Sequence, residues 1–283
     1  MKKTAIVYDF DKTLSPRDMQ EFSLIPSLGY QNAADFWKEV TALSHAQTMD
    51  PISAYLYLLQ KKFQQQGQPL KRENFAQVGK GIQLYPDVET WFERINAYGK
   101  TKGLEVEHYI ISSGMAEILE ETSIARYFRK IYACRYFYNE AQEAVWPAVI
   151  VNYTTKTQYL FRINKQVLDE ADEEDLNTWI PFAERAVPFS RIIYIADGMT
   201  DVPCMRLVKE YGGRSIAVYD PSSQKAGNTA ARLIREGRAD FMTAAQYGPG
   251  GPMETLVKEI LDAMGAESIL DDREGKTDGK VIE

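Results

Sequence analysis

The start of the chain contains the feature that most limits how it can fold, an apolar stretch that ends in two carboxylates. Residues 5–8, Ala-Ile-Val-Tyr, predict a strand that is buried on both faces, as in a parallel sheet. Asp9 and Asp11 follow two residues apart, so an extended chain presents both side chains on the same side. Two acids at the carboxyl end of a parallel strand favour a divalent cation between them. A chance triplet is the alternative in a chain with 40 acidic residues.

Strand and helix patterns alternate along the chain, which predicts an α/β fold with a Rossmann-like, mainly parallel sheet and helices on both faces. Strong strands at 107–111 and 191–196 end in Ser112-Ser113-Gly114 and in Asp197-Gly198-Met199-Thr200-Asp201. Further strands are expected at 132–138, 145–153, 215–219 and 239–241, the first two forming a β-hairpin. Helices are expected at 86–97, 115–122, 158–164, 202–211, 224–236 and from 252 to about 264.

Residues 15–84 have a helical pattern throughout, which predicts a separate unit inserted directly after the first strand. Amphipathic stretches at 33–45, 51–66 and 71–78 are separated by turn residues. An insertion at this point would lie over the carboxyl end of the sheet. We therefore expect a core of residues 1–14 and 85–265, a helical cap of residues 15–84, and a polar, disordered tail of residues 266–283.

Charge and cysteine content limit the partners and the compartment. The net charge of −7 argues against nucleic acid or an anionic membrane surface as a partner, although a local basic pocket for phosphate remains possible. Cys134 and Cys204 do not have a metal-site spacing, and we expect both to be buried, in a protein of the reducing cytoplasm. No apolar run reaches the roughly 18 residues that a membrane-spanning helix needs.

Three polar segments have alternative interpretations from the residues alone. Ser112 to Gly114 could bind an anion with backbone N–H groups, or could be a plain helix N-cap. Lys156 lies at a helix start, where the helix dipole is unfavourable for an ammonium group, and the sequence favours a solvated side chain over one paired with acids. The acidic run from Asp169 to Asp175 indicates a solvated helix face or loop without a site.

Four of these segments follow one another in a fixed order. They are Asp9-x-Asp11-x-Thr13, Ser112 at a strand end, Lys156 at a helix start, and Asp197-Gly198-x-x-Asp201. Together they resemble the motifs of the haloacid dehalogenase-like (HAD) hydrolase superfamily. The inserted helices and the hairpin are similar to those of its phosphoserine phosphatase-like branch. The spacer between Lys156 and Asp197 departs from the family pattern because it is long, and Lys165 is therefore a second candidate for the third motif.

The resemblance implies a Mg²⁺-dependent phosphatase that acts on a small phosphate ester. Asp9 would be the nucleophile that forms an aspartyl-phosphate, and Asp11 the general acid and base. Mg²⁺ would bind Asp9, the backbone carbonyl of Asp11, and Asp197. The other implied residues are Thr13, Ser112, Ser113, Gly114 and Lys156 around phosphate, with Gly198 and Asp201 in support. The Thr13 hydroxyl is also expected to bond the backbone of the Asp11 loop.

The substrate and the final acceptor of the phosphoryl group are less constrained. Asp18 lies where phosphoserine phosphatases have an acid that holds the substrate ammonium group, but a first-turn helix acid is the favoured interpretation. Asp11 indicates phosphoryl transfer, because dehalogenases of the superfamily lack an acid there. A phosphotransferase or mutase with the same nucleophile and a non-catalytic binding module on this fold are the alternatives. Neither the physiological substrate nor the oligomeric state follows from the sequence.

Overall fold

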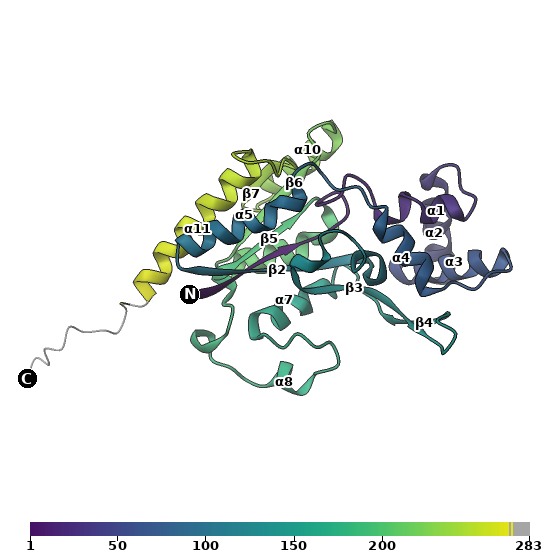
Figure 1. Ribbon diagram of the computed structural model, residues 1–283, viewed down its shortest axis with the longest axis horizontal. Coiled ribbons are helices and arrows are strands. Elements are labelled where there is room, and N and C mark those ends of the chain that lie inside the picture. The colour runs from purple at the N-terminus through teal and green to yellow at the C-terminus, as the bar shows by residue number, and fades with distance from the viewer. Residues whose placement is uncertain (272, 274–283) are drawn as a thin grey trace, which may run out of the picture.

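The structure, a computed structural model, describes residues 1–271 and 273. It contains a seven-stranded sheet with the order β4-β3-β2-β1-β5-β6-β7 and helices on both faces (Figure 1). All neighbouring strands are parallel except β3 and β4. The predicted α/β fold with a mainly parallel sheet is therefore confirmed.

The central strand β1 positions the first carboxylate. The strands are β1 (Lys2–Tyr8), β2 (Leu104–Met115), β3 (Phe128–Tyr138), β4 (Ala144–Val149), β5 (Ile192–Ala196), β6 (Arg214–Tyr219) and β7 (Phe241–Ala244). Residues 4–8 are completely buried, because helices cover both faces of the sheet, and this explains the continuous apolar run. Tyr8 is in register with Ile110 of β2 and Ile195 of β5. The carboxyl ends of β1 and β5 therefore lie side by side, next to the later part of β2.

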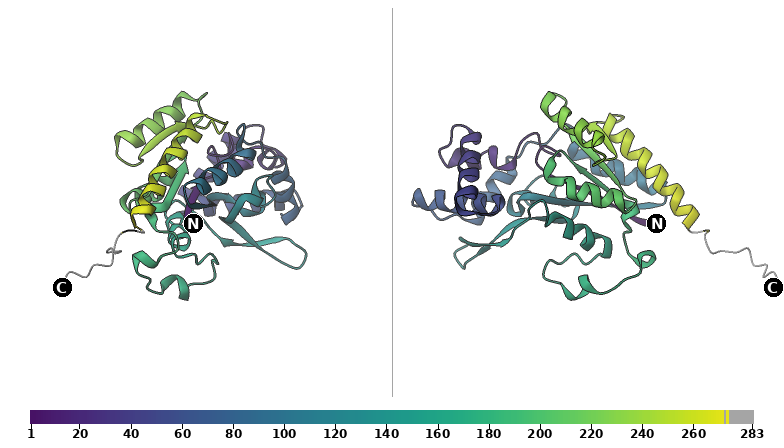
Figure 2. Two further views of the ribbon diagram at one scale, coloured as in Figure 1. Left: turned by 60° about the vertical axis from the view of Figure 1, so that its left-hand side comes forward. Right: turned by 180° about the vertical axis from the view of Figure 1, so that it is seen from behind.

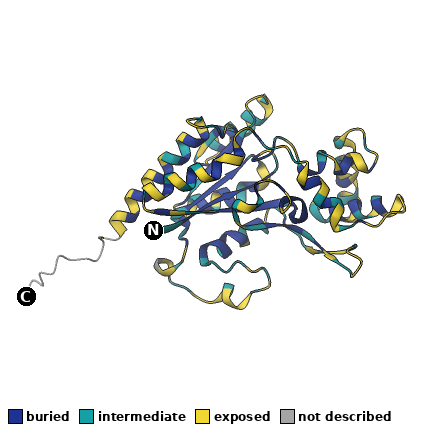
Figure 3. Ribbon diagram, viewed as in Figure 1, coloured by how far each residue is buried: buried dark blue, intermediate teal, exposed yellow. Residues whose placement is uncertain are grey.

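Helices of the α/β part form a layer on each face of the sheet. They are α5 (Val88–Thr101), α6 (Ala116–Leu119), α7 (Lys156–Lys165), α8 (Glu174–Asn177), α9 (Val202–Glu210), α10 (Gln224–Arg235) and α11 (Pro252–Asp271). On one face α5 packs against β2 and α11, and on the other α9 packs against β5, β6 and α7 (Figures 1 and 2). Buried residues follow the strands and the inner sides of these helices (Figure 3). None of the described helices is long and apolar enough to cross a bilayer.

The inserted segment is helical, as predicted, and its helices gather at the end of the molecule opposite the C-terminal part of α11 (Figure 1). It contains a short 3-10 helix, η1 (Met19–Glu21), followed by α1 (Leu24–Ser27), α2 (Ala33–Gln47), α3 (Pro51–Gln65) and α4 (Arg72–Lys80). Asp50 caps α3, since its Oδ1 accepts from the N–H groups of Ile52 and Ser53. Phe36 and Tyr55 are buried and meet edge to face, so the segment has apolar packing of its own.

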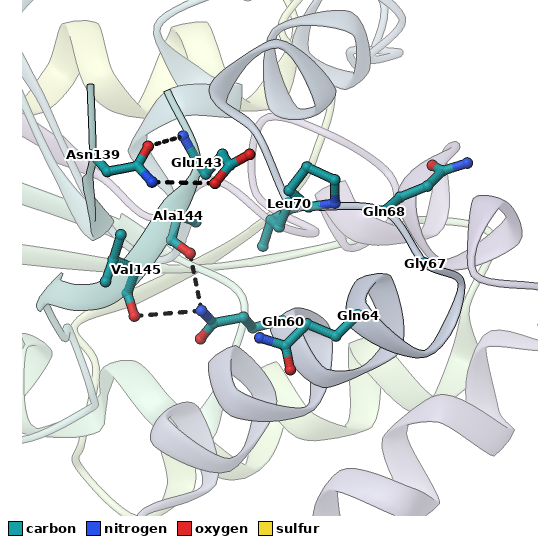
Figure 4. A pocket seen from close by; sticks show the side chains of 10 residues that line it. Gln60, Gln64, Gly67, Gln68, Leu70, Asn139, Glu143, Ala144 and Val145 are labelled. Atoms are coloured by element: carbon teal, nitrogen blue, oxygen red, sulfur yellow. Dashed lines mark hydrogen bonds between the residues drawn. The ribbon is translucent and has the colours of Figure 1, made fainter. Parts of the chain in front are cut away.

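Strands β3 and β4 form the predicted hairpin, and its tip is bonded to the inserted segment. The N–H of Ala144 donates to the carbonyl of Leu70 (2.7 Å), and the N–H of Arg72 donates to the carbonyl of Gln142 (3.2 Å). The Gln60 side chain on α3 also donates to the Ala144 carbonyl (2.9 Å; Figure 4). The inserted segment is therefore joined to the sheet by hydrogen bonds as well as by the chain.

Two predicted boundaries are wrong. Strand β2 continues through the expected Ser/Gly turn to Met115, with a register shift against β3, and α6 has only four residues instead of 115–122. The last helix continues to Asp271, so residues 266–271 are helical rather than disordered. Ser268 is buried there and its hydroxyl donates to the Met264 carbonyl, so helical packing extends past the predicted end. Of the rest of the predicted tail, Arg273 is described, and residues 272 and 274–283 lie outside the described residues.

A buried histidine connects β1, β2 and α5 below the strand ends. His108 Nδ1 lies 3.1 Å from the Tyr8 hydroxyl, and Nε2 lies 2.9 Å from Asn96 Oδ1. Because Asn96 offers an oxygen, Nε2 carries the proton and Nδ1 accepts from Tyr8, which itself accepts from Trp91 Nε1 (2.9 Å). Burial lowers the pKa of His108 to about 3. The imidazole is therefore neutral in the folded protein. Cys134 and Cys204 are both free and buried, as predicted.

We expect His108 to make the folded protein less stable in acid. Histidine in the unfolded chain binds a proton near pH 6.5, whereas buried His108 does so only near pH 3. Between these pH values the unfolded chain binds more protons than the folded protein, so the free energy of unfolding decreases as the pH is lowered. Between pH 7.5 and 5 the wild type should lose about 2 kcal/mol more free energy of unfolding than His108→Gln, measured with urea. His45→Gln, at the exposed histidine, is the control. Equal pH dependence of wild type and His108→Gln would contradict a neutral buried ring.

Candidate active site

Three carboxylates meet at the carboxyl ends of β1 and β5. Asp9 follows β1, and Asp197 and Asp201 follow β5, which is its parallel neighbour. One oxygen of each lies within 4.8 Å of the others. Asp9 is 7% exposed and Asp201 is completely buried. The sheet therefore brings the first and fourth sequence motifs into one cluster.

Lys156 supplies a positive charge inside this cluster. Its Nζ lies 2.8 Å from Asp9 Oδ1 and 2.6 Å from Asp201 Oδ1, and the residue is only 1% exposed. Burial alone would lower the pKa of Lys156, but Asp201 and Asp9 hold it above its ordinary value. The prediction of a solvated Lys156 is wrong, because acids from distant parts of the chain surround it.

The other candidate lysine lies at the opposite end of α7. Lys165 Nζ donates to the backbone carbonyls of Leu176 in α8 and Thr178 directly after it, and it makes no described contact with the acids around Lys156. The acidic run that follows is a loop leading into α8. Its carbonyls at Asp169, Glu170 and Asp172 accept from the Arg162 guanidinium. Of the two lysines, the structure brings Lys156 alone to Asp9.

A turn before α7 fixes where Lys156 enters the site. Asn152 Oδ1 accepts from the N–H groups of Thr154 and Thr155, and Thr155 Oγ1 accepts from the N–H of Asn152. Asn152 Nδ2 also donates to Asp50 Oδ2 of the inserted segment (3.2 Å). Asn152 was not among the residues expected at the site, although an Asn three residues before a Thr at a helix start is a recognisable capping signal.

Asp201 is surrounded by donors from the protein itself. Tyr194 donates to its Oδ1 (2.6 Å) and Thr200 donates to its Oδ2 (3.0 Å), in addition to the bond from Lys156. Because both oxygens already accept hydrogen bonds, Asp201 is better suited to orient Lys156 than to bind a ligand. Tyr194 was not expected here from the sequence, because a tyrosine inside an apolar strand has the pattern of a core residue.

One lysine does not balance the three acids. Burial, followed by repulsion from Asp9 and Asp201, raises the pKa of Asp197 to about 8. Burial also raises the pKa of Asp9 to about 6, although Lys156 opposes the rise. A divalent cation would favour the charged form of both groups, and carboxylate oxygens are the ligands that Mg²⁺ prefers. The donor set is therefore compatible with a hard divalent cation.

Asp11 projects from the loop after β1 toward the inserted segment. Its Oδ1 accepts from the N–H of Met19 in η1 (2.7 Å). Burial, then the nearby carboxylates of Asp18 and Asp9, raises the pKa of Asp11 well above its ordinary value. Lys12 has a positive φ of 57°, and its ammonium group pairs with both oxygens of Asp18, at 2.7 and 2.8 Å. Asp18 precedes η1 but makes no capping bond with it.

Thr13 differs from its predicted contact. Its N–H donates to the Phe10 carbonyl (3.2 Å), and its own carbonyl accepts from the Tyr247 hydroxyl (2.7 Å). The Thr13 hydroxyl is buried and has no hydrogen-bond partner among the described residues, so the expected bond to the backbone of the Asp11 loop is not formed. The turn is held by main-chain hydrogen bonds instead.

The Ser112 segment is the C-terminal part of β2, the other neighbour of β1. Ser112 Oγ accepts from the N–H of Gly114 (2.9 Å), which leaves the hydroxyl hydrogen free to donate. A Cβ on Gly114 would lie 2.1 Å from Met19 Cε, so a larger residue there would have to displace the end of the Met19 side chain. Cys134 Sγ lies 3.4 Å from the Ser113 carbonyl. Gly198 is extended, with φ −138°.

The cavity between the hairpin and α3 is a separate feature. It has a volume of about 450 Å³, and half of its lining residues are polar, among them Gln60, Gln64, Asn139 and Glu143 (Figure 4). None of the predicted site residues lines it. The acids around Lys156 therefore belong to a different part of the molecule.

Comparison with known proteins gives a family and a fold. A family model described as haloacid dehalogenase-like hydrolase matches residues 6–206. An uncharacterized protein of Borreliella burgdorferi is 25% identical over 287 residues, which cover 90% of this chain and 95% of that protein.

Solved structures of three proteins share the fold. A probable phosphoserine phosphatase of Vibrio cholerae has a TM-score of 0.57 at 15% identity, over 94% of this chain and 67% of that one. A substrate-bound phosphoserine phosphatase has a TM-score of 0.56 at 16% identity, over 90% and 98%. A HAD family hydrolase of Salmonella enterica serovar Typhi has a TM-score of 0.54 at 17% identity, over 84% and 66%. This chain thus spans about two thirds of the length of the Salmonella and Vibrio chains.

We expect Lys156→Met to destabilise the metal-free protein by about 3–5 kcal/mol at pH 8, because two buried carboxylates lose their cation. Burial already raises the pKa of Asp9 above the unfolded value near 4, and the variant lacks the lysine that opposes this rise, so the folded variant binds more protons and its stability falls as pH rises. Urea unfolding in EDTA should show a smaller loss at pH 5. Lys165→Met is the matched control. A loss of equal size at both pH values would contradict the buried ion pair.

Proposed function

This chain belongs to the haloacid dehalogenase-like hydrolases, and we propose that it is a Mg²⁺-dependent phosphatase of small phosphate monoesters that forms an aspartyl-phosphate on Asp9. The observation that carries this proposal is the position of Asp9, at the end of the central strand and bonded to buried Lys156. The region that matches the family includes every proposed site residue from Asp9 to Asp201. The phosphoserine phosphatases among the solved neighbours support a phosphate ester as substrate.

In the first half of the reaction Asp9 attacks phosphorus and the ester oxygen leaves. A carboxylate oxygen forms a bond to phosphorus while the bond from phosphorus to the ester oxygen breaks. Asp11 donates its proton to that leaving oxygen, and its raised pKa favours the protonated form that this step needs. Lys156 balances the negative charge of the phosphate oxygens. Because an ester oxygen needs this proton and a halide does not, Asp11 favours ester hydrolysis over dehalogenation.

In the second half water replaces Asp9 on phosphorus. The Asp11 carboxylate takes a proton from water, the water oxygen bonds to phosphorus, and the bond from phosphorus to Asp9 breaks. Inorganic phosphate leaves and both acids return to their starting forms. The Ser112 hydroxyl, with backbone N–H groups of Ser113 and Gly114, would hold phosphate oxygens, and Thr13 lies on the adjacent turn.

Mg²⁺ would be held by Asp9, Asp197 and the backbone carbonyl of Asp11. When bound it supplies positive charge that lets a carboxylate approach a phosphate dianion. Asp201 would orient Lys156, and Gly198 would let the chain pass close to the site. Asp18 is the candidate for substrate contact, since it lies near Asp11. Its carboxylate also forms an ion pair with Lys12.

We expect Asp9→Asn to release no phosphate from p-nitrophenyl phosphate with Mg²⁺, a loss on the order of 10³-fold or more, because the amide is a poor nucleophile. Asp175→Asn, in the exposed acidic run, is the control with full activity. Robust activity of Asp9→Asn would refute the nucleophile assignment. Products should be analysed with glycerol present, because a phosphotransferase would yield glycerol phosphate in place of free phosphate.

Mg²⁺ should raise the thermal unfolding temperature of the wild type, since a ligand at about 100 times its Kd stabilises the folded state by about 2.7 kcal/mol. Asp197→Asn should lose most of this response, because it removes a carboxylate oxygen from the cluster. Asp175→Asn should keep it. An unchanged response of Asp197→Asn would place the cation elsewhere in the protein.

A further inference from the structure

Tyr85 lies where the chain returns from the inserted segment to the sheet, between α4 and α5. Its N–H donates to the Leu14 carbonyl (2.9 Å), so it lies beside the turn that follows Asp9 and Asp11. The residue is 8% exposed. Its hydroxyl is buried and has no hydrogen-bond partner among the described residues.

Two acids from neighbouring strand ends act on this phenol. Burial, then the carboxylates of Asp220 and Asp197, raises the pKa of Tyr85, so the hydroxyl keeps its hydrogen and can only donate toward them. Asp197 follows β5, and Asp220 follows its neighbour β6. The hydroxyl makes a hydrogen bond with neither carboxylate, although both are close enough to influence it.

Several other buried tyrosines have hydrogen-bond partners for their hydroxyls. Tyr247, which lies close enough to Tyr85 to be influenced by it, donates to the Thr13 carbonyl. Tyr132 donates to the Leu168 carbonyl, and Tyr194 donates to Asp201. A buried donor without an acceptor destabilises a fold, and phenylalanine would avoid that cost at position 85. The unpaired Tyr85 hydroxyl therefore needs an explanation that the ligand-free fold does not supply.

We propose that the Tyr85 hydroxyl is a ligand-binding group of the active site, which donates a hydrogen bond to an oxygen held beside Asp197. That oxygen belongs either to a water of the bound cation or to the phosphate group. The inference rests on the proposed function, because both ligands come from it. The unpaired Thr13 hydroxyl lies on the adjoining turn, so two buried hydroxyls at this end of the sheet share the same property.

The test is Tyr85→Phe, measured without substrate turnover. Calorimetry gives the Kd of Mg²⁺ alone and the Kd of inorganic phosphate in saturating Mg²⁺, and thermal unfolding reports the ligand-free protein. We expect the ligand-free unfolding temperature to be unchanged or higher, and at least one Kd to rise roughly ten-fold. Tyr132→Phe is the matched control: it removes a bonded hydroxyl, so it should lower the unfolding temperature and leave both Kd values unchanged.

The two titrations also identify the acceptor. A rise in the Kd of Mg²⁺ assigns the hydroxyl to a water of the cation, and a rise for phosphate alone assigns it to a phosphate oxygen. If Tyr85→Phe binds both as the wild type does, the inference is refuted and the proposed function stands. If the wild type binds neither Mg²⁺ nor phosphate, both are refuted. A lower unfolding temperature with unchanged Kd values would mean that the hydroxyl has a purely structural role.

Discussion

The arrangement of the site depends on one ammonium group held between two buried carboxylates. Lys156 can reach Asp9 and Asp201 only because β1 and β5 are adjacent and parallel, and because the Asn152 turn begins α7 at this edge of the sheet. A buried ammonium or carboxylate alone would be costly, and each makes the other tolerable. The third acid, Asp197, accepts no described hydrogen bond from the lysine. Its raised pKa shows that the cluster favours additional positive charge beside this carboxylate.

The sequence was enough to expect acids at the ends of neighbouring strands, but it did not indicate which residues would contact them. Asp9, Asp11 and Asp197 follow buried strands, and an apolar run that stops at an acid is a local signal. The environment of Lys156 was misjudged because a helix-dipole argument considers only chain neighbours, whereas its partners are 147 and 45 residues away. Tyr85 and Tyr194 were missed for a related reason. A tyrosine in an apolar context has the same pattern whether its hydroxyl meets a carboxylate or a carbonyl.

The sequence predicted the fold more completely than the residues at which individual helices and strands begin and end. Alternating apolar runs were enough for the parallel sheet, since strands buried on both faces need helices above and below. The continuation of β2 through Ser112 to Gly114 depends on its pairing with β3 and on close contact between Gly114 and Met19, and both are tertiary. Met19 also donates its N–H to Asp11. One residue of the inserted segment thus contacts both the proposed acid and the proposed phosphate-binding segment.

The hydrogen bonds between the hairpin tip and residues 70–72 have a consequence for how this protein can be recombined with its relatives. The inserted segment is one continuous stretch of chain that is joined to the sheet at its two ends. It is also hydrogen-bonded to the tip of the hairpin, since Leu70 and Arg72 pair with Ala144 and Gln142. A chimera that exchanged residues 15–84 alone would leave main-chain donors and acceptors unmatched on both sides. The smallest unit for grafting this segment therefore consists of two stretches of chain, the helices and the tip of the β3–β4 hairpin.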